Sequence, residues 1–156
     1  MIAKIKKTNN NLKEMYNILI ENLLKTYPTF HKDDYYNDEK FIKWSTMIKN
    51  NKNYHILAYK KENKIIGFLS YSINNKQLWI SECQIKKEYI NNRILKNLIK
   101  EFTAINNIQS YDIVTIHINS NNELSQKVFK HIGFKFIGNT IYQISLEKLK
   151  KWANII

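Results

Sequence analysis

A chain of 156 residues, of which 44% are hydrophobic and 13% aromatic, is long enough to build one real core, so we expect a single domain over residues 1–156. The net charge of +12 leaves open an anionic partner such as tRNA or the ribosome, although the lysines form no long block and equally suit a diffuse solvated surface. One cysteine excludes an internal disulfide, and neither an apolar leader nor a membrane-length apolar run is found, so we expect a cytoplasmic protein without a membrane segment.

The first half of the chain changes from helical to strand periodicity. Residues 2–5 predict a short strand, and residues 12–28 and 33–50 predict two helices, the first with an apolar stripe that includes Leu19. Residues 54–85 predict three strands joined by tight turns of Lys, Glu, Asn and Gln, so these strands should be antiparallel.

The next segment predicts a crossover between parallel strands. A helix is expected over residues 92–107, and a β-branched strand over residues 111–119. Because strand, helix and strand follow one another, the strands around Ile85 and Ile116 should be parallel. The expected fold class is therefore α/β, in the sense of a mixed α+β sheet with helices on both faces.

The C-terminal quarter predicts one helix and a simpler end. Residues 120–134 show helical spacing, with Leu124 on the apolar face and with Ser120 and Glu123 at capping-box spacing. Residues 135–152 predict one or two strands followed by a basic end.

This element order, together with the stretch NELSQKVFKHIGF, resembles the GNAT superfamily of acetyl-CoA-dependent N-acetyltransferases. The family pattern in that stretch is Asn, a small residue, an aromatic residue and then Gly-Phe at fixed spacing. The positions are filled by Asn122, Ser125, Phe129, Gly133 and Phe134. The resemblance covers nearly the whole chain and implies the GNAT acyl-CoA N-acyltransferase fold. It also implies acetyl-CoA as co-substrate, direct attack by an amine of a small molecule or peptide, and often a homodimer.

The stretch IKKEYINNRILKNLI stands where the family has its pyrophosphate-binding loop. Ile90, Asn91, Arg93 and Leu95 replace the family's Gln or Arg and its small residues, so the diagnostic side chains are lost. Either the loop no longer binds pyrophosphate, or its backbone amides still do, with the chain's only arginine adding charge. The amides concerned belong to Asn91, Asn92, Arg93, Ile94, Leu95 and Lys96.

The resemblance also implies where the rest of the cofactor lies. The pantetheine arm should pass between two strands that diverge at their C-terminal ends. It would lie against Cys83, Gln84 and Ile85, with residues of the following helix beside it. These helix residues are Asn122, Ser125 and Phe129.

Two residues are candidate catalytic bases. Glu82 lies on the strand that borders the thioester in the family, and strand alternation would place it on one side with Ile80 and Gln84. His117 lies on the next strand, where a hydrogen-bonded core histidine is the plainer alternative. Phe129 holds the place of the family's tyrosine proton donor, so that role is vacant.

Two other functions stay open. The lost glycines and missing tyrosine would suit a non-catalytic binding module with the GNAT fold. The lysines at 148, 150 and 151 would suit a basic protein associated with RNA or the ribosome. The four histidines are widely spaced and have no cysteine companions, so we expect no metal.

Overall fold

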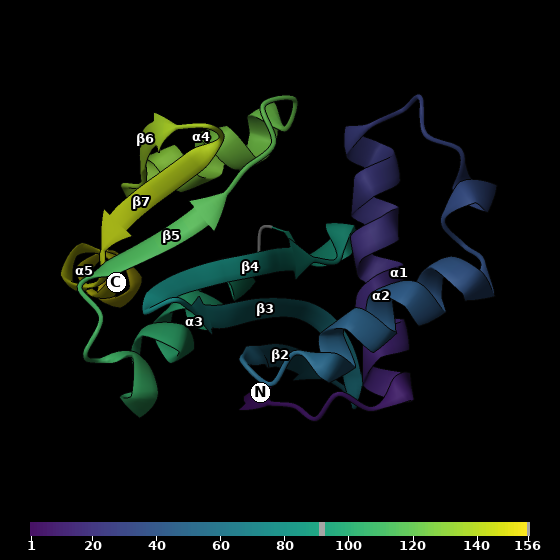
Figure 1. Cartoon of the computed structure of the whole chain (residues 1–156), viewed down its shortest axis with the longest axis horizontal. Coiled ribbons are helices and arrows are strands. Elements are labelled where there is room, and N and C mark those ends of the chain that lie inside the picture. The colour runs from purple at the N-terminus through teal and green to yellow at the C-terminus, as the bar shows by residue number, and fades with distance from the viewer. Residues whose placement is uncertain (91–92, 156) are drawn as a thin grey trace.

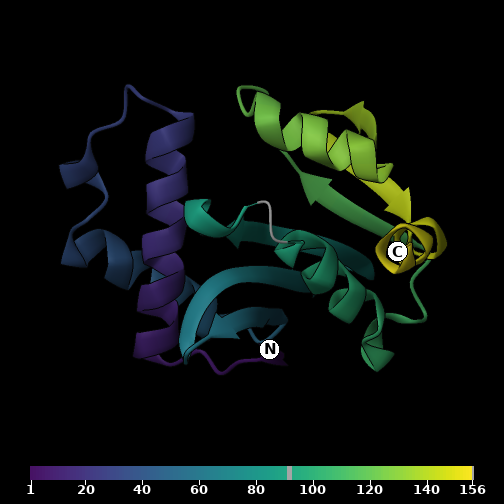
Figure 2. The same ribbon diagram turned by 180° about the vertical axis from the view of Figure 1, so that it is seen from behind.

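The computed structural model describes residues 1–90 and 93–155. One seven-stranded sheet, in the order β1-β2-β3-β4-β5-β7-β6, carries helices on both faces (Figure 1), and the view from behind shows α3 and α4 in front of it (Figure 2). The strands are β1 (Ile2–Lys4), β2 (Tyr54–Lys61), β3 (Lys64–Asn74), β4 (Gln77–Ile85), β5 (Ile113–His117), β6 (Lys135–Gly138) and β7 (Ile141–Ser145). The helices are α1 (Asn9–Thr26), α2 (Asp38–Asn50), α3 (Ile94–Thr103), α4 (Glu123–Ile132) and α5 (Leu146–Asn154). This arrangement confirms the predicted mixed sheet.

The sheet changes direction at one place. Strands β1 to β4 pair antiparallel, β4 and β5 pair parallel, and β5, β7 and β6 are again antiparallel. The parallel pairing joins only residues 78–80 to 114–116, whereas β4 continues to Ile85. The two strands therefore diverge at their C-terminal ends, as predicted.

Each face of the sheet packs on its own core. Phe68 of β3 lies with α1 and α2, and its neighbour Leu69 lies with α3 on the opposite face. Both side chains are fully buried. Because β3 is central and covered on both faces, residues 65–69 are apolar without alternation, and the polar Ser70 and Ser72 that follow are also buried.

Three hairpins close without glycine in the turn. Glu62–Asn63 joins β2 to β3, Asn75–Lys76 joins β3 to β4, and Asn139–Thr140 joins β6 to β7. All six residues have positive φ, between 49° and 66°. Positive φ at both central residues is the geometry of the type I′ turn, whose twist matches that of the strands it joins.

Side-chain caps set several helix starts and correct the predicted boundaries. The second helix begins at Asp38 rather than at residue 33, because the Asn37 side chain accepts the Lys40 backbone N–H at 2.8 Å. Helix α3 ends at Thr103, not at residue 107, and a short 3₁₀ turn follows. Of the described helices, none is both long and apolar enough to cross a membrane.

The structure differs from the predictions for the C-terminal quarter at three places. Helix α4 is capped by Asn122 and not by Ser120, and Leu124 is 65% exposed instead of packing in the core. The expected basic end is instead helix α5, which Ser145 caps. Leu146, Leu149 and Ala153 follow helical spacing and are buried there, while Lys148 and Lys151 between them are exposed.

The central position of Phe68 predicts a large loss of stability on truncation. Phe68→Ala removes a fully buried ring and should lower the free energy of unfolding by about 3–5 kcal/mol in urea denaturation. Phe136→Ala is the matched control, since its ring is 58% exposed, and should cost less than about 1 kcal/mol. Equal losses in both variants would contradict this description of the core.

Candidate functional site

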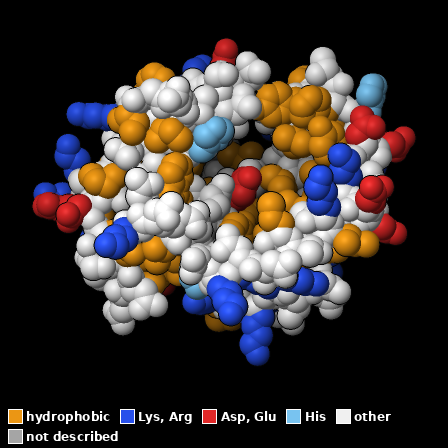
Figure 3. All heavy atoms as spheres, in the orientation of Figure 1, with side chains coloured by type: hydrophobic (Ala, Val, Ile, Leu, Met, Phe, Trp, Pro, Cys, Tyr) orange, Lys and Arg blue, Asp and Glu red, His pale blue; other side chains and the backbone are white. Residues whose placement is uncertain are grey.

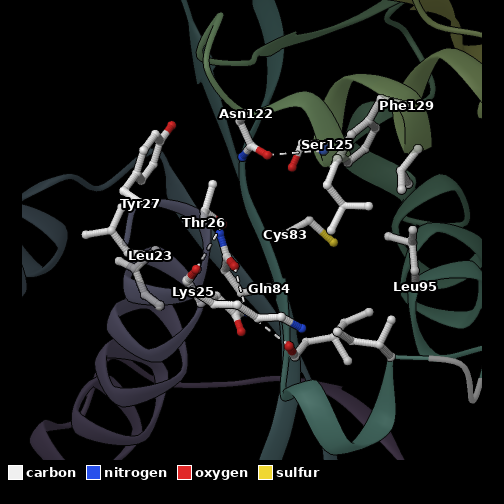
Figure 4. Close-up of a pocket in the computed structure, with 16 residues that line it drawn as sticks. Leu23, Lys25, Thr26, Tyr27, Cys83, Gln84, Leu95, Asn122, Ser125 and Phe129 are labelled. Carbon is white, nitrogen blue, oxygen red and sulfur yellow. Dashed lines mark hydrogen bonds between the residues drawn. The ribbon is translucent and has the colours of Figure 1, made fainter. Parts of the chain in front are cut away.

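A cavity of about 370 Å³ lies where β4 separates from β5. Figure 4 shows α1 residues on one side of the Cys83–Gln84 segment and α4 residues on the other. The lining includes residues that the sequence pattern had brought together, namely Cys83, Gln84, Ile85, Leu95, Asn122, Ser125 and Phe129. The cavity therefore joins both family-like motifs at one place.

The first turns of α4 form one wall. Asn122 accepts the Ser125 backbone N–H at 3.1 Å, so the asparagine that the family pattern contains fixes the start of the helix. One helical turn later, Phe129 is buried and meets Phe134 edge to face, with ring centroids 5.5 Å apart. Phe129 thus offers an apolar surface and no proton to this wall.

The start of α3 keeps glycine-like geometry at one predicted position. Arg93 has φ 59° and ψ 16°, in the left-handed region, and directly precedes the helix without making a side-chain cap. The first amides of a helix have no acceptor within it, so those of Ile94, Leu95 and Lys96 are not bonded inside α3. Asn91 and Asn92 lie outside the described residues.

The side chains at this helix start point to different places. Ile94 is buried beside Gly67, where an added Cβ would lie 3.1 Å from Ile94 Cγ2. The Lys96 ammonium bonds to the Ile155 carbonyl and lies over the Trp152 ring, 5.6 Å from its centroid. Of the predicted loop residues that the structure describes, Leu95 lines the cavity, and Lys96 directs its side chain toward the C-terminal helix.

A β-bulge overturns the predicted grouping of side chains on β4. Ser70 of β3 lies opposite Glu82, and the next residue, Tyr71, lies opposite Ile80, so Ser81 is the extra residue. Ile80 consequently packs in the same cluster as Cys83 and Ile85 rather than on the side of Glu82. Strict alternation failed because one inserted residue reverses the side on which the following residues point.

Glu82 lies on the face of the sheet that α1 and α2 partly cover. Its carboxylate accepts a hydrogen bond of 3.0 Å from Gln84 Nε2. Burial raises the pKa of the Glu82 carboxyl, and the bond from Gln84 opposes that rise. A carboxyl group held in this way binds a proton more readily than one in water.

The neighbouring Tyr54 and Cys83 stay neutral. Burial and the nearby Glu82 raise the pKa of Tyr54 to about 12, although its hydroxyl lies 2.7 Å from Ser70 Oγ. Burial and Glu82 likewise raise the pKa of Cys83 to about 12. Cys83 is therefore a thiol that lines the cavity and is not an activated nucleophile.

His117 is exposed and is not part of the cavity lining. Its neighbours Ile116 and Ile118 pack in the core on the α3 side, so strand alternation directs His117 to the opposite face, the face of Glu82. Figure 3 shows a hollow on the side of the molecule opposite to α3 and α4. Glu82 and His117 thus share a face.

Sequence reasoning missed the part of the site that α1 contributes. Leu19, Asn22 and Leu23 of α1 line the cavity, and so does Tyr27 directly after the helix, although the apolar stripe of this helix was interpreted as core alone. Leu19 and Leu23 are only partly buried, whereas Leu12 and Met15 at the other end are fully buried. Asn22, which interrupts the stripe, was the one signal of a polar role.

No group of three or more His, Cys, Asp or Glu side chains suited to a metal ion occurs within residues 1–90 and 93–155. The lining of the cavity is mainly apolar, with amide and hydroxyl groups at a few places. Such a surface suits an elongated organic ligand with a few hydrogen-bonding groups.

Solved structures share this fold over almost their full length. PaiA N-acetyltransferase from Thermoplasma acidophilum, solved in complex with coenzyme A, is 18% identical, with 93% of this chain and 98% of that chain covered and a TM-score of 0.72. An acetyltransferase from Thermus thermophilus is 10% identical, with 93% of this chain and 96% of that chain covered and a TM-score of 0.74. A GNAT-family acetyltransferase from Staphylococcus aureus is 14% identical, with 94% of this chain and 99% of that chain covered and a TM-score of 0.70. At these identities the likeness establishes the fold alone.

The sequence comparison with families extends this result. No curated protein matched the chain. The model of a family described as an acetyltransferase (GNAT) domain matches residues 26–147, which include the end of α1, the diverging strands and the start of α4. Because that match spans most of the 156 residues, the chain belongs to the GNAT acetyltransferase family.

Proposed function

We propose that the chain is an acyl-CoA-dependent N-acetyltransferase that uses acetyl-CoA, or another acyl-CoA, to acylate the amine of a small molecule or peptide. The observation that carries this proposal is the cavity between the diverging strands, which ends against α4 and borders the strand of Glu82. PaiA N-acetyltransferase, which has the same fold, was solved with bound coenzyme A, and this supports the proposal that the present chain binds an acyl-CoA.

The cofactor would use backbone and apolar groups more than charged side chains. Its pantetheine arm would lie along Cys83 to Ile85, with Asn122, Ser125 and Phe129 on the other side. Its pyrophosphate would meet the free amides of Ile94 to Lys96, together with those of Asn91 and Asn92. The left-handed backbone at Arg93 supports this placement, because the family uses small residues there to expose the amides.

In the proposed reaction, the amine nitrogen forms a bond to the thioester carbonyl carbon, and the carbon–sulfur bond then breaks to release the thiolate. Glu82 would take the proton that the amine loses, and its raised pKa suits a base that works near neutral pH. His117, on the same face, is the second candidate for this proton. Phe129 cannot donate to the thiolate, so its proton must come from another group.

A second candidate function is a binding module that retains the fold without catalysis. Phe129, in the position of the usual tyrosine, is the observation that favours it. Calorimetric titration of CoA does not separate the two functions, because an enzyme and a CoA-binding module both bind CoA. Transfer of a labelled acetyl group to an amine does separate them, since only the enzyme carries it out. An anionic acceptor such as aminoacyl-tRNA belongs in the same acceptor screen because of the net charge of +12.

Removal of the base should reduce turnover. Glu82→Gln preserves shape and cannot accept the proton, so kcat should fall by about 100- to 10,000-fold with labelled acetyl-CoA, once an acceptor has been found. CoA affinity should change little. A variant as fast as the parent protein would exclude Glu82 as the base.

The same substitution should stabilise the protein at high pH. A raised folded-state pKa means that the protonated carboxyl favours the folded state, and this stability is lost as pH rises through that pKa. Glu82→Gln should therefore raise the Tm at pH 8, by an amount that shrinks toward pH 4 in thermal unfolding. The exposed Glu101, changed to Gln, should not raise the Tm at pH 8. The raised pKa would be contradicted if the difference in Tm between Glu82→Gln and the parent were smaller at pH 8 than at pH 4.

The α3 start should contribute to CoA affinity. Arg93→Ala should weaken CoA binding by about 10- to 150-fold, the equivalent of a charge-assisted contact of roughly 1.5–3 kcal/mol, in calorimetric titration. Lys86→Ala, on the strand side of the same segment, is the control and should change the affinity far less. Absence of any CoA or acetyl-CoA binding at millimolar concentration would remove the enzyme proposal as a whole.

A further inference from the structure

A chain of hydrogen bonds runs from α1 to the Glu82 carboxylate. Asn22 Nδ2 donates to Gln84 Oε1 at 2.9 Å, and Gln84 Nε2 donates to Glu82 Oε2 at 3.0 Å. Asn22 Nδ2 also donates to the Ile85 carbonyl at 3.0 Å. Figure 4 shows Gln84 on the β4 segment beside the end of α1.

The polarity of this chain is determined by its ends. A carboxylate only accepts hydrogen bonds, so Gln84 must turn its NH₂ group toward Glu82 and its carbonyl toward Asn22. Asn22 must then present its own NH₂ group, which the Ile85 carbonyl also holds in place. Each of the two amide NH₂ groups thereby donates to an oxygen, and the amide of Gln84 has one orientation that fits both of its bonds.

Strand alternation explains why Gln84 and Glu82 meet, and the bulge on β4 determines which face they share. Ser81 is the extra residue, and after it Glu82 and Gln84 lie two residues apart on one face, opposite Ser70 and Phe68 of β3. Ser70 Oγ is engaged by the Tyr54 hydroxyl. Gln84 is therefore the side chain that donates to Glu82 among the hydrogen bonds of the described residues.

Two effects act on the pKa of the Glu82 carboxyl: burial raises it, and the hydrogen bond from Gln84 lowers it. The titratable groups near Glu82 are Tyr54 from β2 and Cys83 on β4 itself, with His117 of β5 on the same face. Helix α1 contributes the uncharged Asn22 to the chain, while its Glu21 is paired with Lys87 at 3.5 Å.

We infer that Gln84, held in one orientation by Asn22, is a positioning residue that aims the Glu82 carboxylate at the acceptor amine and favours its ionised form. The inference rests on the proposed function, since it assigns a role toward the base of that reaction. Asn22 and Gln84 both line the cavity, so the wall that would hold the thioester also holds the base. The base that would activate the amine and the wall that would hold the thioester are therefore both positioned by β4 and by α1, which packs against it.

The test is the pH dependence of Gln84→Met, which keeps the length of the side chain and removes the donor. The pKa of Glu82, followed by NMR of ¹³C-labelled glutamate, should rise, because a bond to the charged form is lost. The acid limb of kcat/KM should move to higher pH in step. At pH 7 the rate should fall by about 10-fold, the scale of one hydrogen bond to a charged group, and recover as pH rises.

Asn22→Leu should produce a smaller shift in the same direction, and it carries the test if Gln84→Met does not fold. Gln109→Met is the matched control, because Gln109 makes side-chain bonds to the Thr103 and Ile105 carbonyls away from the cavity. It should leave both the titration and the rate unchanged.

The possible results distinguish the positioning role of Gln84 from the assignment of Glu82 as the catalytic base. An unchanged Glu82 titration in Gln84→Met, or a rate lowered equally at every pH, overturns the positioning role. A shifted titration together with an unchanged rate in Glu82→Gln supports the role of Gln84 toward the carboxylate and contradicts the base assignment alone.

Discussion

The site depends on one constraint, which is that the parallel pairing of β4 with β5 ends at Ile80 while β4 continues for five more residues. Backbone groups on that side of β4 lose their partner strand, and buried or ligand-facing backbone groups need another. Asn22 of α1 supplies one donor, to the Ile85 carbonyl. The remaining space is the cavity, and helices α1 and α4 approach it from opposite sides because no strand fills it.

A second constraint acts within β4 itself. The bulge at Ser81 reverses the side on which the following residues point, so the strand buries Ile80, Cys83 and Ile85 together and presents Glu82 and Gln84 to the other face. A carboxyl group in a central strand would normally be costly. Here it is tolerated because the face is only partly covered and because Gln84 donates to it. The geometry places the one acidic group of β4 on a partly covered face, and burial together with Glu82 keeps the thiol of Cys83 neutral.

Periodicity predicted the elements well where the core alone decides them. The parallel crossover, the antiparallel hairpins and the α4 segment follow from spacing, since burial on a sheet or helix face is what spacing records. Helix α5 was missed because its lysines concealed a three-residue apolar stripe of Leu146, Leu149 and Ala153. The bulge at Ser81 and the bonds of Asn22 could not be predicted, because both depend on contacts between segments far apart in the chain.

The left-handed turns bear on how this family can be recognised. The chain has three glycines, yet Asn, Lys, Glu, Thr and Arg residues adopt positive φ at the hairpin turns and at the α3 start. Each such residue with a side chain costs roughly 1–2 kcal/mol relative to glycine, and the surrounding structure must supply that energy. At Arg93, a residue with a long side chain adopts the left-handed conformation that glycine adopts most readily. In a glycine-poor chain, left-handed turns of this kind are recorded in the backbone dihedral angles, and the positions of glycine in the sequence do not reveal them.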